Sequence, residues 1–262
     1  MECMQVKNKM NRLNLSGMTD LYDQRLEQAM KEKWAYSTFL ETLLTDALER
    51  KDNKQLTLRL AKSRLDVTRT METFDFLRKD LVVPVSLIRE LATCGFIEKN
   101  QNIFIFGMAG LGKSHIGQAI GLQACRQGLE VLFYDTKEVM DWIYAGIGDG
   151  SRKKRLAHVI KTPLLILDDW GLQELNIEQQ SDLYQIIAER YEKKSIILTT
   201  NKAIEEWSDI FTHPLIGSAA VDRLVHRGVE VVLGGPSHRL TEYKKTCDLA
   251  SKNRKKQIIT AN

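Results

Sequence analysis

The chain has 262 residues, 43% of them hydrophobic, and its 38 lysine and arginine residues outnumber 34 acidic residues to give a net charge of +4. These values are ordinary for a folded protein with one α/β core and a small companion domain. No apolar run approaches the roughly 20 residues that cross a bilayer, so we expect a cytoplasmic protein without a membrane segment. The scattered cysteines form no CxxC pair, which argues against a zinc site and favours reduced thiols, with Cys94 and Cys125 as core residues.

The first part of the chain is predicted to be helical. Apolar residues recur at helical spacing over residues 13–48, with Gly17 and Ser37 marking breaks between short helices. A further helix is expected over about residues 53–65, and no heptad pattern continues long enough for a coiled coil. We therefore predict a small all-α N-terminal domain over residues 1–70.

A linker is predicted over residues 71–85, because the segment VTRTMETFDFLRKDLVVP has mixed character and ends at Pro84. Phe74 and Phe76 alternate with polar neighbours, which suits an extended segment packed on a neighbouring surface. The linker leads into the larger part of the chain, where the pattern changes.

Apolar strands alternate with helices from residue 86 onward. The expected strands are 102–106, 131–135, 164–169, 195–201 and 229–233, and the expected helices are 86–93, 113–127, 137–144, 177–193 and 219–226. This alternation predicts an α/β domain over residues 86–240, built on a five-stranded parallel sheet with helices on both faces. Residues 241–262 form a basic tail.

The stretch GMAGLGKS, residues 107–114, follows a predicted strand and opens a predicted helix, which is the context that a GxxxxGK[ST] pattern requires. Its glycines let backbone N–H groups surround phosphate oxygens, Lys113 would reach the β- and γ-phosphates, and the Ser114 hydroxyl would bind Mg²⁺. The alternative is a glycine-rich turn with only a structural role, which would need neither Lys113 nor Ser114. The predicted nucleotide-binding residues are Gly107, Met108, Ala109, Gly110, Leu111, Gly112, Lys113, Ser114 and His115.

Two carboxylates end the apolar stretch LLILDD. Asp168 would hold Mg²⁺ together with Ser114, and Asp169 would orient and deprotonate the attacking water. The alternative is a buried strand that ends in an ordinary Asp-Asp turn. Asp169 has a shorter side chain than the glutamate that many such ATPases carry at this position.

Two further polar residues are candidates for the reaction site. If strand 195–201 lies between strand 102–106 and strand 164–169, Asn201 stands beside the γ-phosphate. Asparagine at a strand end is also a common turn residue. Arg223 and Arg227 are spaced to share one face of an amphipathic helix. An arginine from a neighbouring subunit would neutralise transition-state charge, whereas two arginines on a helix are more often surface charges.

Basic residues gather in residues 50–69, in residues 152–155 and after residue 239, whereas the intervening stretch from residue 162 to 230 is acidic. This distribution suggests a polyanion partner beyond the nucleotide. Solvated helix faces and a disordered tail are the alternative explanation.

Several motifs, in order and spanning nearly the whole chain, resemble the IstB-like branch of the AAA+ ATPases. They are LNLSGM, METFDF, RELAT, FIEKNQNIFIFGMAGLGKSH, LLILDDWG, ILTTN followed by EEW, and VDRLVHRG. Members of this branch are transposition helper proteins of bacterial insertion sequences and are related to the DnaC helicase loader. Only 29 residues follow Leu233 in the chain of 262, too few for the helical lid of a full AAA+ module. The resemblance therefore implies an AAA+ P-loop fold without a C-terminal lid.

The resemblance also implies a function: an ATPase, slow and stimulated by DNA or partner, that uses ATP and Mg²⁺. The homo-oligomer, with ATP at subunit interfaces, would bind double-stranded DNA without base specificity and recruit or stimulate a partner transposase. Asp169, Asn201 and Arg223 would be catalytic, the last as an arginine finger. The N-terminal domain would serve oligomer, DNA or partner contacts. The implied phosphate contacts to DNA are Arg59, Lys62, Arg64, Arg69, Arg152, Lys153, Lys154 and Arg155.

Two alternatives remain open at this point. A DnaC-like loader of a replicative helicase shares the ATPase core, but LNLSGM and METFDF resemble the transposition branch. A small-molecule P-loop kinase would need a substrate lid and neither Arg223 nor the basic segments. The roles of Arg227 and Arg239 stay undecided.

Overall fold

The computed structural model describes residues 2–238, within two compact units, Met1–Arg59 and Leu60–Asn262. The segment predicted as a linker, residues 71–85, lies in the second unit. Arg239 and the predicted basic tail, residues 241–262, lie outside the described residues. Among the helices that the structure describes, none combines the length and the apolar character needed to cross a membrane.

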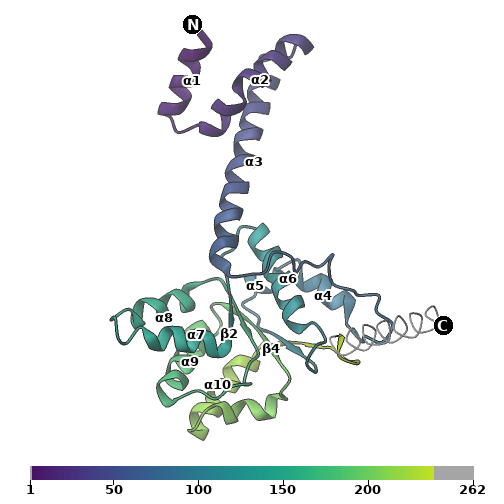
Figure 1. The fold of residues 1–262 in the computed structure, drawn as a ribbon, viewed down its shortest axis with the longest axis vertical. Helices are drawn as coiled ribbons and strands as arrows, with labels where there is room; N and C mark the ends of the chain where they lie inside the picture. The colour runs from purple at the N-terminus through teal and green to yellow at the C-terminus, as the bar shows by residue number, and fades with distance from the viewer. Residues whose placement is uncertain (1, 239–262) are drawn as a thin grey trace, which may run out of the picture. The chain divides into compact units, whose positions relative to one another are not determined.

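The first unit is helical, as predicted. It contains α1 (Glu2–Arg12), α2 (Ser16–Glu32) and most of α3 (Tyr36–Ser63), drawn in purple and blue in Figure 1. Its small core consists of Met18, Tyr22 and Leu43. Gly17 lies against α3, because a Cβ atom there would be 3.0 Å from Ala47 Cα. This glycine therefore allows α2 to approach α3 closely.

Helix α3 is longer than the sequence pattern suggested. A separate helix over residues 53–65 was expected, whereas a single helix runs through Tyr36–Ser63. The stretch contains no glycine or proline, and it is rich in leucine, lysine, arginine and glutamate, which all favour helix. Polar residues in its middle change the pattern of burial without breaking the backbone.

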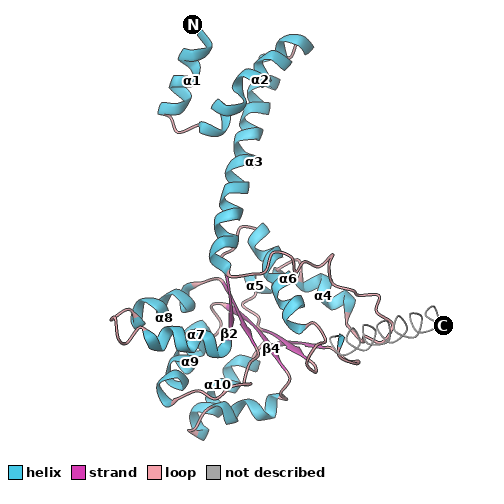
Figure 2. Cartoon of the chain, viewed as in Figure 1, coloured by secondary structure: helices cyan, strands magenta, loops and turns pink. Residues whose placement is uncertain are grey.

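The second unit is built on a five-stranded sheet, shown in magenta in Figure 2. Its strands are β1 (Ile103–Phe106), β2 (Val131–Asp135), β3 (Leu164–Asp168), β4 (Ser195–Thr200) and β5 (Val229–Val232). They pair in the order β2-β3-β4-β1-β5, and every neighbouring pair is parallel. The predicted five-stranded parallel sheet is confirmed, and the carboxyl ends of all its strands meet at one edge.

The helices of this unit follow the predicted order. They are α4 (Val85–Leu91), α5 (Gly95–Glu98), α6 (Lys113–Arg126), α7 (Thr136–Ala145), α8 (Arg152–Lys161), α9 (Ile177–Arg190) and α10 (Pro214–Val225). Three elements were not predicted: the short α5, α8, which contains the basic block, and a 3₁₀ helix, η1 (Ile204–Ile210). Figure 1 shows α6 on one side of the sheet and α7 to α10 on the other.

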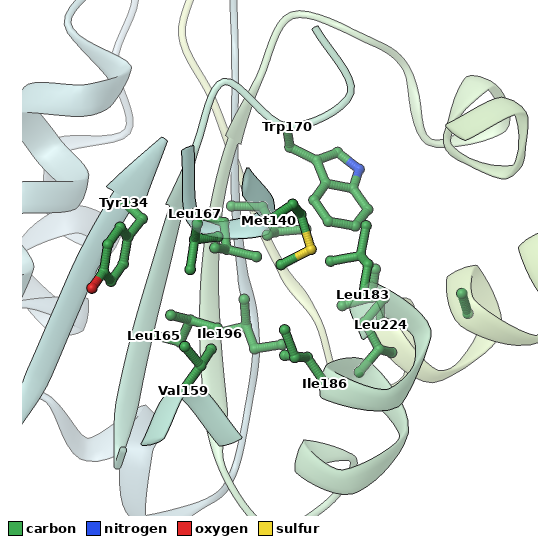
Figure 3. Close-up of a cluster of buried hydrophobic side chains, with 14 of the residues drawn as sticks. Tyr134, Met140, Val159, Leu165, Leu167, Trp170, Leu183, Ile186, Ile196 and Leu224 are labelled. Atoms are coloured by element: carbon green, nitrogen blue, oxygen red, sulfur yellow. The ribbon is translucent and has the colours of Figure 1, made fainter. Parts of the chain in front are cut away.

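Strand β3 is buried on both faces, which explains its unbroken apolar sequence. Leu165 and Leu167 point into the core beneath α7 to α10 (Figure 3). Ile166 faces α6, where a Cβ on Gly121 would come within 2.7 Å of its Cδ1 atom. The small residue lets α6 lie directly on the sheet. Cys94 and Cys125 are also buried, as predicted, and burial raises the pKa of Cys94 to about 11.

A buried arginine that the sequence analysis did not single out ties three elements together. Arg190 ends α9 and is 1% exposed. Its Nη1 atom donates to the carbonyls of Val159, Ile160 and Thr162, at the C-terminal end of α8, and its Nη2 atom donates to Ser195 O. Burial lowers the pKa of Arg190 to about 9, which leaves the guanidinium charged at neutral pH. Carbonyl dipoles, including those at the negative end of α8, stabilise this charge.

We expect Arg190→Ala to lower the free energy of unfolding by about 3 kcal/mol or more, because several buried carbonyls lose their donor. Urea denaturation followed by circular dichroism measures this change. Arg126→Ala is the matched control, since Arg126 ends α6 in the same way but is exposed. Equal stability of the two variants would contradict the structural role of Arg190.

Candidate nucleotide-binding site

The loop between β1 and α6 has a backbone that requires glycine at three positions. Gly107, Gly110 and Gly112 have φ values of 150°, 80° and 93°. A Cβ atom on Gly107 would also lie 2.8 Å from Leu233 O. The loop leads directly into the N-terminus of α6, whose free N–H groups and dipole favour an anion. The glycine pattern of the sequence thus folds into a shape suited to phosphate.

Lys113 opens α6 and turns back over this loop. The side chain is buried, at 7% exposure. Its Nζ atom donates to Gly107 O at 2.7 Å and to Met108 O at 3.1 Å. These bonds hold the ammonium within the concave side of the loop, where it is positioned to meet a phosphate. Ser114 follows, half-buried, on the first turn of the helix.

A cavity of about 450 Å³ lies over the loop, a volume within the usual range for small-molecule sites. It brings together predicted residues from three separate places in the sequence. They are Lys113 and Ser114 after β1, Asp169 after β3 and Asn201 after β4. Strand β4 lies between β1 and β3, which is the arrangement that the prediction for Asn201 required.

The two carboxylates after the apolar run of β3 occupy different positions. Asp169 lines the cavity and has a φ of 51°, a left-handed conformation that aspartate tolerates better than most residues. Asp168 is the last residue of β3, and its carboxylate accepts a hydrogen bond from the Thr199 hydroxyl of β4. The change of backbone conformation between the two residues separates their side chains.

The oxygen atoms near this edge of the sheet suit Mg²⁺. The Ser114 hydroxyl and the Asp168 carboxylate are hard oxygen donors, which this ion prefers. One oxygen of Asp168, Oδ1, is engaged by Thr199, and Oδ2 makes no hydrogen bond among the described residues. Residues 2–238 hold no cluster of three or more potential metal-ligating side chains. A site with few protein ligands fits an ion that also takes phosphate oxygens and water.

Two tryptophans that the sequence analysis did not assign anchor the turns around the site. Trp170 follows Asp169 and is fully buried, and its backbone N–H donates to Thr199 O. It meets Trp207 of η1 edge to face, with ring centroids 5.9 Å apart. Trp207 in turn stacks on Phe106 at the end of β1. The tryptophans of the LLILDDWG and EEW motifs therefore connect the end of β3 with the end of β1 through η1.

The predicted linker packs on the phosphate loop. Phe74 lies so close to Gly112 that a Cβ there would be 2.6 Å from its ring, and the ring also meets His115 edge to face. Arg69, which is predicted from the sequence to contact DNA, lines the cavity and forms an ion pair with Asp66. This segment thus forms one wall of the cavity.

The chain after β5 closes the loop from another side. Gly234 forms an antiparallel bridge with Val82 of the linker, and Arg78 donates to Pro236 O at 2.6 Å. The backbone N–H of His238 donates to Gly110 O at 2.9 Å. The sequence pattern gave no signal for this closure, because it depends on backbone contacts between distant segments.

Arg223 lies on α10, away from the cavity of its own chain. Its Nη1 atom donates to the Tyr184 hydroxyl, and its guanidinium lies over the Tyr184 ring. The expected helix over residues 219–226 is instead α10 (Pro214–Val225). Arg227 therefore follows the helix, with a φ of 60°, and pairs with Glu192. The prediction that one helix face carries both arginines is wrong because the helix ends before Arg227.

The basic block on α8 divides into two pairs. Arg152 forms a bidentate ion pair with the buried carboxylate of Asp182, and this hydrogen bonding raises the pKa of Arg152. Arg155 donates to Trp142 O and to Asp149. Lys153 and Lys154, in contrast, are exposed. Within this block, the two lysines are the side chains best placed to meet an external polyanion.

The remaining basic candidates are near the end of α3. Arg64 has a φ of 63°, pairs with Glu138 and lies over the Tyr134 ring. Lys62 is exposed in the second unit, and Arg59 is half-buried in the first. The structure thus places Arg64 against β2 and α7, whereas Lys62 faces solvent.

Comparison with known proteins finds a matching family and several relatives. The family described as IstB-like ATP binding protein matches residues 8–246. A protein of Mycobacterium tuberculosis is 31% identical over 235 residues, which cover 89% of this chain and 93% of the relative. A protein of the insertion sequence IS5376 from Geobacillus stearothermophilus is 33% identical over 232 residues, which cover 88% and 92%. Both names describe a "putative ATP-binding protein" of an insertion sequence.

Solved structures show the same fold at lower identity. The DnaC helicase loader aligns with a TM-score of 0.50 at 24% identity, over 57% of this chain and 88% of that one. The replication initiator DnaA, bound to AMPPCP and single-stranded DNA, aligns with a TM-score of 0.53 at 22% identity, over 64% and 51%. The fold is thus that of the AAA+ ATPases. Together with the match over residues 8–246, this establishes that the chain belongs to the family of IstB-like ATP-binding proteins.

Proposed function

We propose that this IstB-like protein is an ATPase that assembles on double-stranded DNA and recruits or stimulates a partner transposase. The observation that carries the proposal is the composition of the cavity over the phosphate loop. It combines a buried lysine, a helix N-terminus, a carboxylate and a strand-end amide. Nucleotide binding alone would need the first two features, whereas the carboxylate and the amide suit the attack of water on a phosphate.

Binding of ATP begins at the loop. Lys113 supplies a positive charge to the β- and γ-phosphates, and the N–H groups at the start of α6 supply hydrogen bonds. Because Lys113 is held by Gly107 O and Met108 O, little side-chain entropy remains to be lost when phosphate arrives. Ser114 and Asp168 would hold Mg²⁺, which neutralises phosphate charge when bound.

Hydrolysis is assigned to Asp169 and Asn201. The Asp169 carboxylate accepts a proton from water while the water oxygen attacks the γ-phosphorus and the bond to the β-phosphate oxygen breaks. Asn201 hydrogen-bonds the γ-phosphate or the attacking water. Both residues line the cavity from neighbouring strand ends, which supports their acting on the same phosphate.

Assembly is proposed to complete the site. Arg223 does not line the cavity of its own chain, so its proposed role as an arginine finger requires the ATP of a neighbouring protomer. Such a residue would make hydrolysis depend on oligomer formation. DNA binding is proposed for exposed basic residues such as Lys153 and Lys154, which would contact phosphates without reading bases.

Transposition is favoured over helicase loading as the setting. The two relatives described above, at 31% and 33% identity, are named for insertion sequences, whereas the likeness to the DnaC helicase loader, at 24% identity, concerns the fold alone. A transposase partner is accordingly the proposal. A small-molecule kinase is disfavoured by the length of the family match, which extends through the helical N-terminal unit.

We expect Lys113→Ala to abolish ATP binding and, with it, ATP-dependent binding to DNA. The cause is the loss of the positive charge that faces the phosphates. Titration with a fluorescent ATP analogue and a gel-shift assay with and without ATP measure the two effects. Lys99→Ala, which removes an exposed charge, is the control. Unchanged ATP-dependent DNA binding by Lys113→Ala would sink the proposed coupling.

Asp169→Asn is expected to bind ATP normally. Its rate of ATP hydrolysis should fall at least about 100-fold, because asparagine cannot accept the proton from water. Phosphate release under saturating ATP, with and without DNA, provides the measurement. Asp52→Asn, an exposed change in the first unit, controls for loss of charge. Turnover close to that of the unmodified protein would remove Asp169 from this role.

The double variant Lys153→Ala/Lys154→Ala should bind DNA more weakly for every sequence. If both lysines contact phosphate, the slope of log affinity against log salt concentration should fall by about two. Fluorescence anisotropy of labelled duplexes at several salt concentrations measures the slope. The double variant Lys193→Ala/Lys194→Ala, at two adjacent lysines just before β4, is a control with the same loss of charge. Equal slopes for the two double variants would exclude the α8 lysines as contacts.

A further inference from the structure

Thr199 of β4 is completely buried on the face of the sheet that α6 covers. A Cβ atom on Gly117 of α6 would lie 3.5 Å from its methyl carbon, Cγ2. Because a β-branched side chain has few rotamers, contact of the methyl group with α6 fixes where the hydroxyl points. The hydroxyl points toward the end of β3.

The hydroxyl of Thr199 makes two hydrogen bonds of opposite sense. It donates its single hydrogen to Asp168 Oδ1, and it accepts the backbone N–H of Asp169 at 3.1 Å. One threonine thus contacts both acidic residues at the end of β3. A hydroxyl can do this because it is a donor and an acceptor at once, whereas a methyl group is neither.

The backbone of the same threonine completes the arrangement. Thr199 O accepts the N–H of Trp170 at 2.8 Å, so the turn from Asp168 to Trp170 is held at three points by one residue. Asp169, in the middle of this turn, has the left-handed φ of 51° that places it at the cavity. The bonds from Thr199 offset the cost of that conformation.

Neighbouring hydroxyls serve other atoms. Thr136 donates to the backbone carbonyl of Asp168 at 2.8 Å, and Thr200 donates to Trp170 O at 3.0 Å. Neither of these bonds reaches a carboxylate. Thr199 is therefore distinguished from them by its contact with the Asp168 side chain, and by its place on β4 two residues before Asn201, which follows the strand.

We propose that Thr199 is a positioning residue for nucleotide hydrolysis: its hydroxyl orients the Asp168 carboxylate toward magnesium and holds the Asp169 turn at the cavity. The inference rests on the proposed ATPase function. With Oδ1 engaged by Thr199, Oδ2 is the oxygen left for the metal or its water. Asn201 directly follows the same strand, so β4 sets the positions of both the γ-phosphate sensor and the acidic pair.

The experiment compares Thr199→Val, which keeps the shape but loses the hydroxyl, with Thr199→Ser, which keeps the hydroxyl but loses the methyl. Thr162→Val is the matched control. Thr162 precedes β3 and is buried like Thr199, but its hydroxyl donates to the backbone carbonyl of His158 and not to a carboxylate. Thermal unfolding of each variant shows whether it is folded. If the valine variant does not fold, Thr199→Ala against Thr199→Ser makes the same comparison.

Two measurements are needed. The magnesium concentration for half-maximal binding of a non-hydrolysable fluorescent ATP analogue should rise about 10-fold in Thr199→Val, and kcat for ATP should fall about 10- to 100-fold. Analogue binding in EDTA should not change. Thr199→Ser should recover most of both losses, and Thr162→Val should show neither.

Unchanged magnesium dependence and kcat in Thr199→Val would overturn the inference, as would a serine variant as impaired as the valine variant. The two measurements also separate this inference from the proposed function. If the unmodified protein releases phosphate no faster than Lys113→Ala, the proposed ATPase function fails, and the magnesium dependence of analogue binding still decides the role of Thr199.

Discussion

Burial of the central strands on both faces is the constraint on which the rest of the second unit depends. β1, β3 and β4 lie side by side between α6 and the helices α7 to α10, so the middle of each strand is apolar. Most polar side chains lie toward the ends of these strands, and parallel pairing brings all the carboxyl ends to one edge. The phosphate loop, the acidic pair and Asn201 meet at this edge because burial on both faces favours apolar side chains in the middle of the strands. Glycines on α6, such as Gly121, bring the helix and its N-terminus down onto that edge.

Buried cations in this unit are held by backbone carbonyls. Lys113 donates to carbonyls of the phosphate loop, and Arg190 donates to carbonyls at the end of α8 and the start of β4. The physical device is similar, but the consequences differ. Arg190 is enclosed by the core and joins three elements, whereas Lys113 lines an open cavity and can exchange carbonyl contacts for phosphate. A buried charge is therefore a functional signal only when its surroundings leave room for a ligand.

The acidic pair shows how a short motif acquires two roles. Asp168 and Asp169 are adjacent and chemically identical, yet the backbone enters a left-handed conformation at the second residue. Thr199 contacts both, and Trp170 anchors the turn from below. The uncharged side chains of Thr199 on the neighbouring strand and Trp207 on η1 thus support the acidic pair to which the chemistry is assigned.

Much of the fold could be predicted because it follows from local patterns. Apolar runs bounded by turns predicted the five strands, and the glycine spacing together with Lys113 predicted the phosphate loop, since both reflect backbone and burial rules that act over a few residues. Helix boundaries were less certain: α3 continued through a polar stretch, and α10 stopped before Arg227. Tertiary structure alone decided which arginines are engaged in ion pairs, that Arg69 lines the cavity, and that Thr199 reaches Asp168. These facts depend on the order of strands and on contacts between residues distant in the chain, which periodicity and spacing do not encode.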